Sequence, residues 1–585
     1  MSKWMIAHRG ADFEQISKDF NISPVTARLI RNRGVIGTDS IRKYLRGNLN
    51  DIHSPYELTD IKKASELLLQ KIKQKSKIRI IGDYDVDGVC STYILWAGIR
   101  RAGGNVDYRL PDRILDGYGL NERLVEEAKA DGIDTIITCD NGIAAKQQVD
   151  MAKKYGMTVI ITDHHEVPFD KNTSEQILPN ADVVVDPKRQ DCDMAFKEIC
   201  GAVVAYKFLQ VMFDENSFEN SEFFKEMIEF AAMATVCDVM PLEDENRIIV
   251  KEGLKEMRNS HNTGLKALIL VNNIDSEKIS SYTLGFVLGP CLNATGRLDT
   301  AMRGMALLTS TDENTAVTIA SELKALNDSR KTMTQEGVEK ASNEMETVDK
   351  IPKVIVLYQP DLHESIAGIV AGKVKEKYNR PTIVLTNAHE GAKGSGRSIE
   401  NYDMFRELSA CKDLFTKFGG HKMAAGLSLP IENIDILRRK LNDNCELTEN
   451  DFTQVKYLDM ELPLWFLNMD MVKEFDLLEP YGNGNSKPIF AVRDVSIISG
   501  RIMGKNKNCG KYKIVDSRNN QYEMVYFGDM EKWHDFLISR YGNDICERMY
   551  NKGDCKEIKV NVAYYPDINS WQGRESLQIV MTDFC

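Results

Sequence analysis

The sequence lacks the features of a membrane protein or a secreted protein. No stretch approaches the roughly 18 consecutive apolar residues that a membrane span needs. The first ten residues, MSKWMIAHRG, contain no apolar block like that of a signal peptide. Repeats of fixed period and low-complexity segments are also missing. We therefore expect a globular protein of the cytoplasm that does not bind a membrane.

Paired cysteines are missing as well. The 12 cysteines are scattered along the chain and include no C-x-x-C pair. This spacing argues against a zinc ribbon and against a disulfide framework. We expect most of these cysteines to be reduced and buried among apolar side chains.

The chain has no excess of positive charge. It contains 75 Lys+Arg against 87 Asp+Glu, which gives a formal net charge of −12. This balance argues against a protein coated in basic charge for nonspecific binding to nucleic acids. An anionic substrate would have to be bound by a local group of side chains.

The length of 585 residues and the apolar pattern predict several α/β domains. Residues 77–185 alternate short β-branched runs with amphipathic segments, a pattern typical of a parallel sheet with crossover helices. Residues 312–346 have helical periodicity and no proline, and residues 353–385 repeat the α/β pattern. Five short strands after Pro488 predict a small OB-like β-barrel. The predicted parts are a helical segment (1–50), a parallel-sheet domain (51–310), a connector helix (311–350), a second α/β domain (351–450) and the OB-like domain (451–585).

Three carboxylates follow the first predicted strand, in the motif Gly82-Asp83-Tyr84-Asp85-Val86-Asp87-Gly88. If the backbone is extended, these carboxylates share one side and can bind a hard divalent cation. An EF-hand calcium loop is the alternative, but it needs flanking helices and a glutamate at position twelve. Here a strand precedes the motif and Val89-Cys90-Ser91-Thr92 follows it, so the sequence favours a site at a strand end.

Two later strands also end in polar motifs, Thr138-Cys139-Asp140-Asn141-Gly142 and Thr162-Asp163-His164-His165. The carboxyl ends of parallel strands meet at one edge of a sheet, so we expect the three motifs to converge. Asp238 ends an apolar helical stretch and on its own is typical of a helix terminus. Four acidic groups with one or two imidazoles fit Mg²⁺ or Mn²⁺, with imidazole favouring Mn²⁺. So many ligands indicate two ions and phosphodiester hydrolysis.

These motifs resemble those of the DHH phosphoesterase superfamily, which is named for the motif that stands here as Asp163-His164-His165. Other segments are similar to its RecJ exonuclease family, namely Asn293–Arg297, Leu326–Arg330, Gly394–Ser398, Phe418–His421, Ala424–Gly426 and Tyr481–Asn485. The resemblance runs from about residue 50 to the C-terminus. It implies an α/β fold in which a DHH parallel-sheet domain is joined by a long helix to a DHHA1 α/β domain, with a C-terminal OB-like β-barrel.

The same resemblance implies an exonuclease that degrades single-stranded DNA from the 5′ end in DNA repair and recombination, with two ions of Mn²⁺ or Mg²⁺. A monomer is expected, with a helicase and a single-strand-binding protein as candidate partners. Asp83 either binds a metal or orients a ligand, and His165 is either a ligand or a contact to the scissile phosphate. The implied metal ligands are Asp83, Asp85, Asp87, Asp140 (bridging), His164 and Asp238, and the implied catalytic residues are Asp83, Asp140, His164 and His165.

Two glycine-rich motifs of the second α/β domain, Gly394–Ser398 and Gly419–His421, are typical of loops that let backbone amides approach a phosphate. Flexible turns without a ligand are the alternative. Arg297 has the planar fork that suits a phosphate, with a buried salt bridge as its alternative. Arg109 and Arg113 flank Pro111 just after a predicted strand and are weaker candidates for lining the path of the DNA strand. The predicted DNA or phosphate contacts are Arg109, Asn293, Arg297, Ser395, Gly396, Arg397, Ser398, Gly419, Gly420 and His421.

The sequence departs from the family pattern at Cys291, where the resemblance leads us to expect arginine. Two alternative functions stay open. One is a DHH phosphodiesterase of short oligonucleotides or cyclic dinucleotides, but such proteins are commonly shorter and lack the barrel. The other is a non-catalytic replication scaffold, which would have lost metal ligands, whereas the expected set is complete here.

Overall fold

The computed structural model describes residues 2–585 except 114, 171–172, 216–220, 505–506, 552, 554, 556 and 572. The chain forms two compact units. One is Gly47–Phe452, and the other combines Met1–Arg46 with Thr453–Cys585. Each unit is described separately below.

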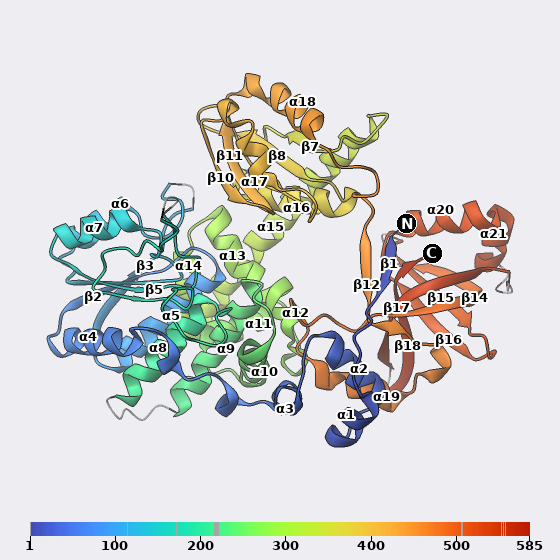
Figure 1. The fold of residues 1–585 in the computed structure, drawn as a ribbon, viewed down its shortest axis with the longest axis horizontal. Coiled ribbons are helices and arrows are strands. Elements are labelled where there is room, and N and C mark those ends of the chain that lie inside the picture. Colours follow the sequence, from blue (N-terminus) through green and yellow to red (C-terminus); the bar gives the residue numbers. More distant parts are fainter. Residues whose placement is uncertain are drawn as a thin grey trace. The chain divides into compact units, whose positions relative to one another are not determined.

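A five-stranded parallel sheet forms the first domain of the larger unit (Figure 1). Two separate apolar clusters line its two faces, one formed with α6 and α7 and the other with α4, α5, α8 and α9. Because both faces are covered, the strands β4 and β6 are buried along their whole length. The predicted parallel sheet with crossover helices is therefore confirmed. In spatial order the strands are β3 (Asn105–Arg109), β2 (Lys77–Ile81), β4 (Thr135–Cys139), β5 (Thr158–Thr162) and β6 (Val183–Val185).

Helices make up the rest of this domain. The segment from α12 to α13 is one continuous helix, in which five residues adopt π-helical geometry. The helices are α4 (Ile61–Lys73), α5 (Val86–Arg101), α6 (Glu122–Ala130), α7 (Lys146–Lys154), α8 (Gly201–Asp214), α9 (Ser221–Cys237), α10 (Asp244–Met257), α11 (Thr263–Val271), α12 (Ser281–Thr283), the π segment η4 (Leu284–Leu288), α13 (Gly289–Leu298) and α14 (Met302–Leu308).

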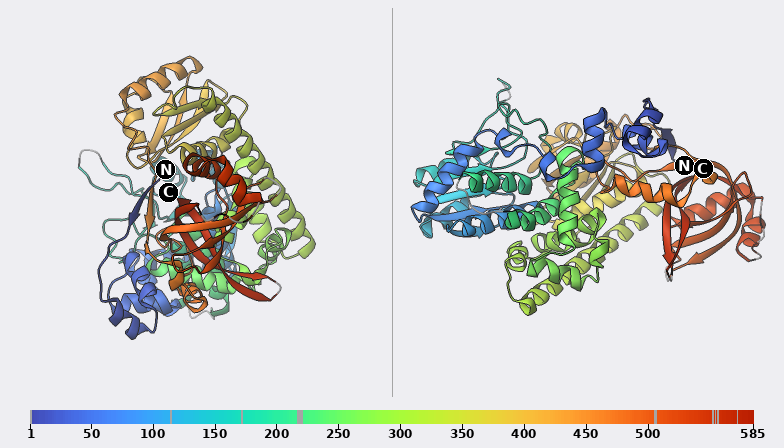
Figure 2. Two further views of the ribbon diagram at one scale, coloured as in Figure 1. Left: turned by 90° about the vertical axis from the view of Figure 1, so that its right-hand side faces the viewer. Right: turned by 90° about the horizontal axis from the view of Figure 1, so that it is seen from below.

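The connector α15 (Glu313–Glu346) is a single helix of 34 residues, seen in yellow-green in the left view of Figure 2. It leads into a mixed five-stranded sheet, in which only the pair of β7 and β8 is parallel. The second α/β domain and its connector helix are confirmed. The strand order is β10 (Lys417–His421), β11 (Ala424–Leu429), β9 (Ala392–Arg397), β8 (Thr382–Asn387) and β7 (Ile355–Tyr358), with helices α16 (Ala367–Tyr378), α17 (Met404–Ser409) and α18 (Ile434–Asn444).

The smaller unit contains a closed five-stranded barrel, as the strand pattern predicts. It closes because β17 pairs with both β18 and β14. The strands are β14 (Phe490–Met503), β15 (Cys509–Val515), β16 (Gln521–Tyr526), β18 (Arg574–Phe584) and β17 (Lys559–Trp571), preceded by β13 (Met460–Glu461) and α19 (Met469–Glu474). The strand pattern did not reveal two helices between β16 and β17, which are α20 (Met530–Tyr541) and α21 (Asn543–Asn551).

The N-terminal segment folds onto this barrel. Leu29 and Ile30 share an apolar cluster with Leu464 and Phe490 of the barrel region, and both are at most 1% exposed. The indole Nε1 of Trp4 also donates to Asp583 at 2.8 Å, close to the C-terminus. The elements are β1 (Lys3–Ile6), α1 (Phe13–Phe20), α2 (Pro24–Asn32) and α3 (Thr38–Arg46), and β1 pairs in parallel with β12 (Val455–Leu458).

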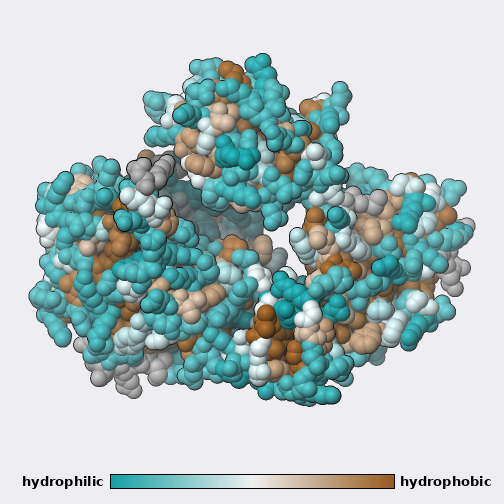
Figure 3. Space-filling model, viewed as in Figure 1, coloured by the Kyte–Doolittle hydropathy of each residue, from teal (hydrophilic) through white to brown (hydrophobic). Residues whose placement is uncertain are grey.

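The cysteines and the surface agree with a globular chain. Ten of the 12 cysteines are buried and the other two are partly buried, as predicted. The face in Figure 3 is mostly hydrophilic, with hydrophobic residues in small patches. Within the described residues, no helix is long and apolar enough to cross a membrane.

Truncating Leu29 should destabilise the barrel unit, although the two are far apart in the sequence. Leu29 is fully buried in the shared cluster, and a buried leucine cut to alanine loses about 2–5 kcal/mol of unfolding free energy. Denaturant unfolding of Leu29→Ala should show this loss, whereas Ile36→Ala, at a position that is 64% exposed, should not. Equal midpoints for the two variants would contradict the packing described here.

Candidate active site

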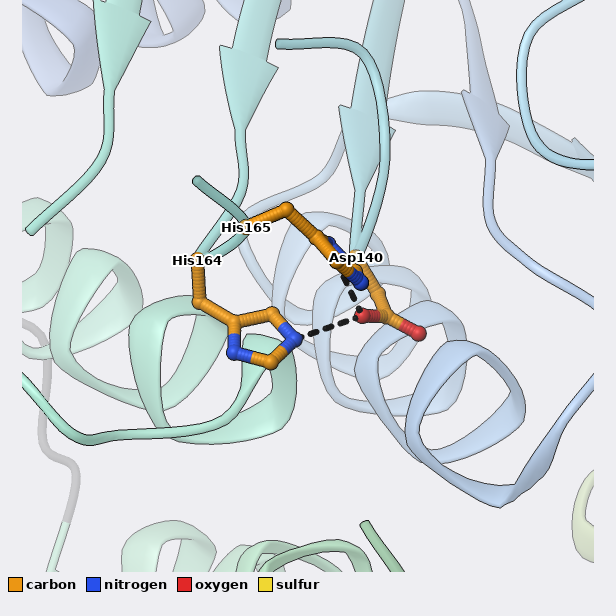
Figure 4. Close-up of side chains that lie close together, drawn as sticks. All are labelled: Asp140, His164 and His165. Carbon is orange, nitrogen blue, oxygen red and sulfur yellow. Dashed lines mark hydrogen bonds and ion pairs between the residues drawn. The ribbon is translucent and has the colours of Figure 1, made fainter. Parts of the chain in front are cut away.

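Three polar motifs lie at one edge of the parallel sheet. The strands β2, β4 and β5 each end one or two residues before the first aspartate of a motif, Asp83, Asp140 or Asp163, and their carboxyl ends share an edge because they are parallel. Figure 4 shows Asp140, His164 and His165 coming from two neighbouring strand ends and pointing toward one another. The structure therefore brings these motifs together, as the strand ends predict.

The first motif is extended only in part. Helix α5 begins at Val86, and Asp85 is its N-cap, with a side chain that accepts from the backbone N–H of Gly88 at 3.1 Å. Asp87 therefore lies in the first helical turn and does not follow the alternation of a strand. The expectation that Asp83, Asp85 and Asp87 share one side is wrong for this reason.

Three groups of acidic and imidazole side chains gather at this edge, each with ligand atoms within 4.8 Å of one another. Asp140 and His164 each belong to two of the groups. Asp140 thus stands between the other ligands, in the position that a carboxylate shared by two cations would occupy. The groups are Asp83 with Asp85 and Asp140; Asp87 with His164 and Asp238; and Asp140 with His164 and His165.

His164 faces three carboxylates. Its Nε2 atom lies 3.1 Å from Oδ1 of Asp140, 3.5 Å from Oδ2 of Asp87 and 3.8 Å from Oδ2 of Asp238. Burial lowers the pKa of His164 even though the carboxylates oppose this effect. The ring is therefore neutral at neutral pH, which is the form of histidine that binds a metal.

The first turn of α8 holds Asp87. Backbone N–H groups of Gly201 and Ala202 donate to its two oxygens, each at 2.7 Å. The positive end of the helix dipole thus stabilises this carboxylate. Position 201 requires glycine, because a Cβ atom there would lie 2.7 Å from the Cβ atom of Asp140.

Burial and mutual repulsion raise the pKa of four carboxyl groups above the usual aspartate range, with burial the larger cause in each case. Holding like charges together in this way is costly unless a cation lies among them. Oxygen donors with an imidazole are the donor set of Mn²⁺ or Mg²⁺, so the residues present fit such ions. The four groups are Asp83, Asp85, Asp140 and Asp238.

Asp163 orients His165 and belongs to none of the three groups. Its carboxylate accepts from Nδ1 of His165 at 2.8 Å and from the N–H of Ile143 at 2.9 Å. Burial would raise the pKa of Asp163, but the hydrogen bonds from His165 and Ile143 and the positive charge of the two histidines together outweigh burial, so the pKa is lowered. Burial likewise opposes the charge on His165, yet Asp163 raises its pKa to about 9. Because its pKa is raised, His165 is a cation at neutral pH. The hydroxyl of Tyr118 also contacts the His165 ring.

Four arginines from separate segments form a second cluster. Burial lowers the pKa of Arg297 to about 10, and repulsion by Arg113, Arg330 and Arg397 adds to this effect. Arg297 donates to the carbonyl of Ser365 at 2.8 Å. Within the described part of the chain, none of the four forms an ion pair, so the salt bridge considered for Arg297 is not found. Guanidinium groups without a counter-ion suit a phosphate.

Sequence reasoning only partly identified this arginine cluster. Arg297 and Arg397 are predicted contacts, but Arg330 was missed as a candidate contact. The sequence feature that could have identified Arg330 is the resemblance of Leu326–Arg330, on the connector helix, to a family motif. Arg113, a weaker candidate from the sequence, lies four residues after the end of β3.

Two predicted DNA contacts are engaged within the protein. Nε of Arg109 pairs with Glu127 at 2.5 Å, which neutralises its charge. Oδ1 of Asn293 accepts from the backbone N–H of Val86 at 3.2 Å. The contacts seen for Arg109 and Asn293 therefore do not support their predicted role in DNA binding. Asn293 instead supports the first turn of α5.

The glycine motifs of the second domain are strands, so the expectation of loops is wrong. Gly394 and Gly396 lie in β9, which is paired on both sides, whereas Gly419 and Gly420 lie in β10 at the edge of the sheet. A Cβ atom on Gly394 would lie 2.3 Å from the carbonyl oxygen of Val384. Close contact between neighbouring segments, rather than approach to an anion, accounts for glycine at this position.

The polar side chains of these strands differ in their contacts. Ser398 is 2% exposed and its hydroxyl donates to the carbonyl of Tyr402 at 2.6 Å, so it supports the fold instead of facing a phosphate. A Cβ atom on Gly368 would lie 2.8 Å from Arg397 and 3.3 Å from Ser395. These two side chains therefore lie together against the start of α16. His421 is exposed on the edge strand.

Comparison with known proteins finds three family models along the chain. They are the DHH family N-terminal domain at residues 77–235, the DHHA1 domain at 352–447 and the RecJ OB domain at 458–583. Their order matches the three folded parts described above.

Several relatives match nearly the whole chain. The single-stranded-DNA-specific exonuclease RecJ of Bacillus subtilis is 33% identical over 99% of this chain and 70% of its own length. RecJ of Escherichia coli is 31% identical over 96% of this chain and 95% of its own length. The crystal structure of RecJ with Mn²⁺ from Thermus thermophilus matches with a TM-score of 0.81 at 25% identity, covering 100% of this chain and 79% of that one.

Without metal, the protein should lose stability as the pH rises. Burial and then the charges of Asp87 and Asp85 raise the pKa of Asp238 to about 8, whereas an unfolded aspartate has a pKa of about 3.9. Between these values the folded protein binds protons that the unfolded chain releases. The unfolding free energy of the metal-free protein therefore falls from about pH 4 to pH 8.

Mn²⁺ should reverse this trend because it competes with those protons. The rise in Tm on replacing EDTA with Mn²⁺ should be larger at about pH 8 than at about pH 6, which differential scanning fluorimetry can measure. Asp443→Asn, an exposed aspartate on α18, is the control and should keep the full rise. A rise that persists in Asp140→Ala, or that is independent of pH, would contradict the proposed site.

Proposed function

The chain belongs to the RecJ family of single-stranded-DNA-specific exonucleases, and we propose that it degrades single-stranded DNA from the 5′ end by hydrolysing phosphodiester bonds. The resemblance inferred from the motifs is confirmed. The observation that carries the proposal is the position of Asp140, whose carboxylate is shared between a group of aspartates and a group that contains both histidines. The alternative activity on short oligonucleotides is not favoured, because relatives matched over nearly the whole chain are exonucleases.

Two ions of Mn²⁺ or Mg²⁺ are the proposed cofactors. Structures of the relative from Thermus thermophilus are described as complexes with either ion. When bound, two such ions activate water and stabilise charge on the attacking and leaving oxygens of a phosphodiester. Asp83 and Asp85 would hold one ion, and Asp140 would bridge the two. The other would be held by Asp87, His164 and Asp238.

His165 and the arginines would act on the substrate itself. His165 is a partly exposed cation held by Asp163 and Tyr118, so it is placed to donate a hydrogen bond to the scissile phosphate. Arg297 and Arg397 would hold phosphates of the strand through charge-assisted hydrogen bonds. A separate role in positioning falls to Asp163, whose carboxylate accepts from Nδ1 of His165 and from the N–H of Ile143.

The cellular role follows from the substrate. An enzyme that takes only single strands depends on a process that separates the duplex, so we place it in DNA repair and recombination beside a helicase and a single-strand-binding protein. We propose a monomer, since the ligands and arginines described here all come from one chain. The cytoplasm is the proposed location.

Replacing Asp140 with alanine should abolish hydrolysis, because both proposed ions lose a ligand. We expect at least a thousandfold loss of activity, of the order seen when a group central to charge stabilisation is removed. A long single strand labelled at the 5′ end, digested with Mn²⁺, Mg²⁺ or EDTA, measures activity, polarity and metal need together. Early release of a labelled mononucleotide is expected. Equal digestion of blunt duplex, or activity limited to di- to tetranucleotides, would contradict the proposed substrate.

Replacing Arg397 with alanine should weaken substrate binding more than it slows the chemical step. A lost charge-assisted hydrogen bond costs about 1.5–3 kcal/mol, or roughly 10- to 100-fold in KM. Arg303→Ala is the matched control, because Arg303 is already paired with Asp299 and Glu322. Steady-state kinetics on a single-stranded oligonucleotide separate the two parameters. Similar KM values for the two variants would show that Arg397 does not bind a phosphate of the substrate.

A further inference from the structure

One long helix of the first domain carries a stripe of accessible side chains from end to end. Along Ser281–Leu298, most intervening positions are buried, while exposed positions (Tyr282 and Phe286) and then partly exposed positions recur at intervals of three or four residues. This spacing places them on a single helical face. The stripe consists of Tyr282, Phe286, Pro290, Asn293 and Arg297.

The C-terminal end of this stripe reaches the active site. Asn293 accepts from the N–H of Val86 in the aspartate motif, and Arg297 belongs to the arginine cluster. A Cβ atom on Gly296 would lie 2.5 Å from the carbonyl oxygen of Tyr84, so the helix lies directly against that motif. Whatever binds along this face is therefore continuous with the site of hydrolysis.

The N-terminal end of the stripe is aromatic. Tyr282 and Phe286 are 67% and 66% exposed, and their rings are stacked with centroids 4.8 Å apart and planes inclined by 24°. Seven residues of helix, about 10 Å at 1.5 Å per residue, separate Phe286 from Asn293. Two nearly parallel, exposed rings thus lie on the same helix as Asn293 and Arg297.

We propose that Tyr282 and Phe286 form a stacking site for nucleobases of the single strand whose phosphates reach the arginines. This inference rests on the proposed function. Aromatic rings suit an unpaired strand because every base has a π-face, so the contact binds any sequence. The arginines would fix the backbone, and the rings would fix bases further along the same strand. A paired duplex has its bases already stacked, so the site would favour single strands.

The test compares ring variants in a background that cannot hydrolyse DNA. Binding of a fluorescent single-stranded oligonucleotide to the full chain carrying Asp140→Ala is measured by anisotropy, with Phe286→Ala, Phe286→Leu and Phe286→Trp added in turn. Base stacking predicts that alanine and leucine raise Kd about 5- to 100-fold, whereas tryptophan keeps the affinity. Tyr155→Ala is the control, because Tyr155 precedes β5 and lies at the opposite edge of the sheet.

Abasic nucleotides then show whether the ring contacts a base. An abasic nucleotide is placed at one position of the oligonucleotide at a time. At one or two positions it should raise the Kd of the parent protein and leave the Kd of the Phe286→Ala variant unchanged. Equal binding by Phe286→Ala and Tyr155→Ala would overturn the inference. The inference would also fail if each abasic position weakened binding by Phe286→Ala as much as it weakens binding by the parent protein. A lowered Tm of Phe286→Ala without a change in Kd would overturn it too, because the ring would then contact protein and not DNA.

The two proposals fail separately. If the unmodified protein does not degrade single-stranded DNA, the proposed function is wrong. If it does, and the Phe286 variants bind like the control, only the stacking site is wrong.

Discussion

The architecture of the first domain depends on keeping several like charges together in a buried place. Four carboxyl groups with raised pKa values meet at the edge of the parallel sheet, beside His164 and Asp87. Each charge needs its own support, because neighbouring aspartates repel one another strongly when buried. The chain supplies it from separate elements. Helix α8 holds Asp87 with two N–H groups, and the N-cap geometry of α5 holds Asp85.

This arrangement also changes the meaning of the net charge of −12. Part of the acidic excess is gathered in one cluster that fits cations, and bound cations would reverse its local sign. The arginine cluster is the opposite case, since its guanidinium groups are partly buried and have no carboxylate partner in the described part of the chain. Without a bound partner of opposite charge, each cluster lowers the stability of the fold because its like charges repel one another. A metal-bound phosphodiester strand would satisfy both, which is why the total charge of the chain does not indicate its substrate.

The sequence predicts those parts of the molecule that follow from short-range pattern. Parallel strands and their ends can be read from β-branched runs, and they place Asp140 and His164 at a common edge. The pattern fails where tertiary contacts decide. Glycines that suggest a loop lie in β9 because Val384 leaves no room for a side chain at Gly394. Asn293 forms a hydrogen bond with Val86, and Arg109 forms one with Glu127. These partners are distant in the sequence, so the pattern does not show them. The packing of the N-terminal helices on the barrel has no local signal at all.

The helix from Ser281 to Leu298 links these observations. Its buried face packs into the core of the domain, and its accessible face passes from two aromatic rings to Asn293 and Arg297. Asn293 accepts from Val86 in the first turn of α5, the turn that carries Asp87, so this helix is in direct contact with the aspartate motif. The π segment contains Phe286, one of the two rings, and such segments often occur at functional sites. The proposed strand contacts on this helix and the proposed ligands of the aspartate motif therefore lie on elements that touch each other.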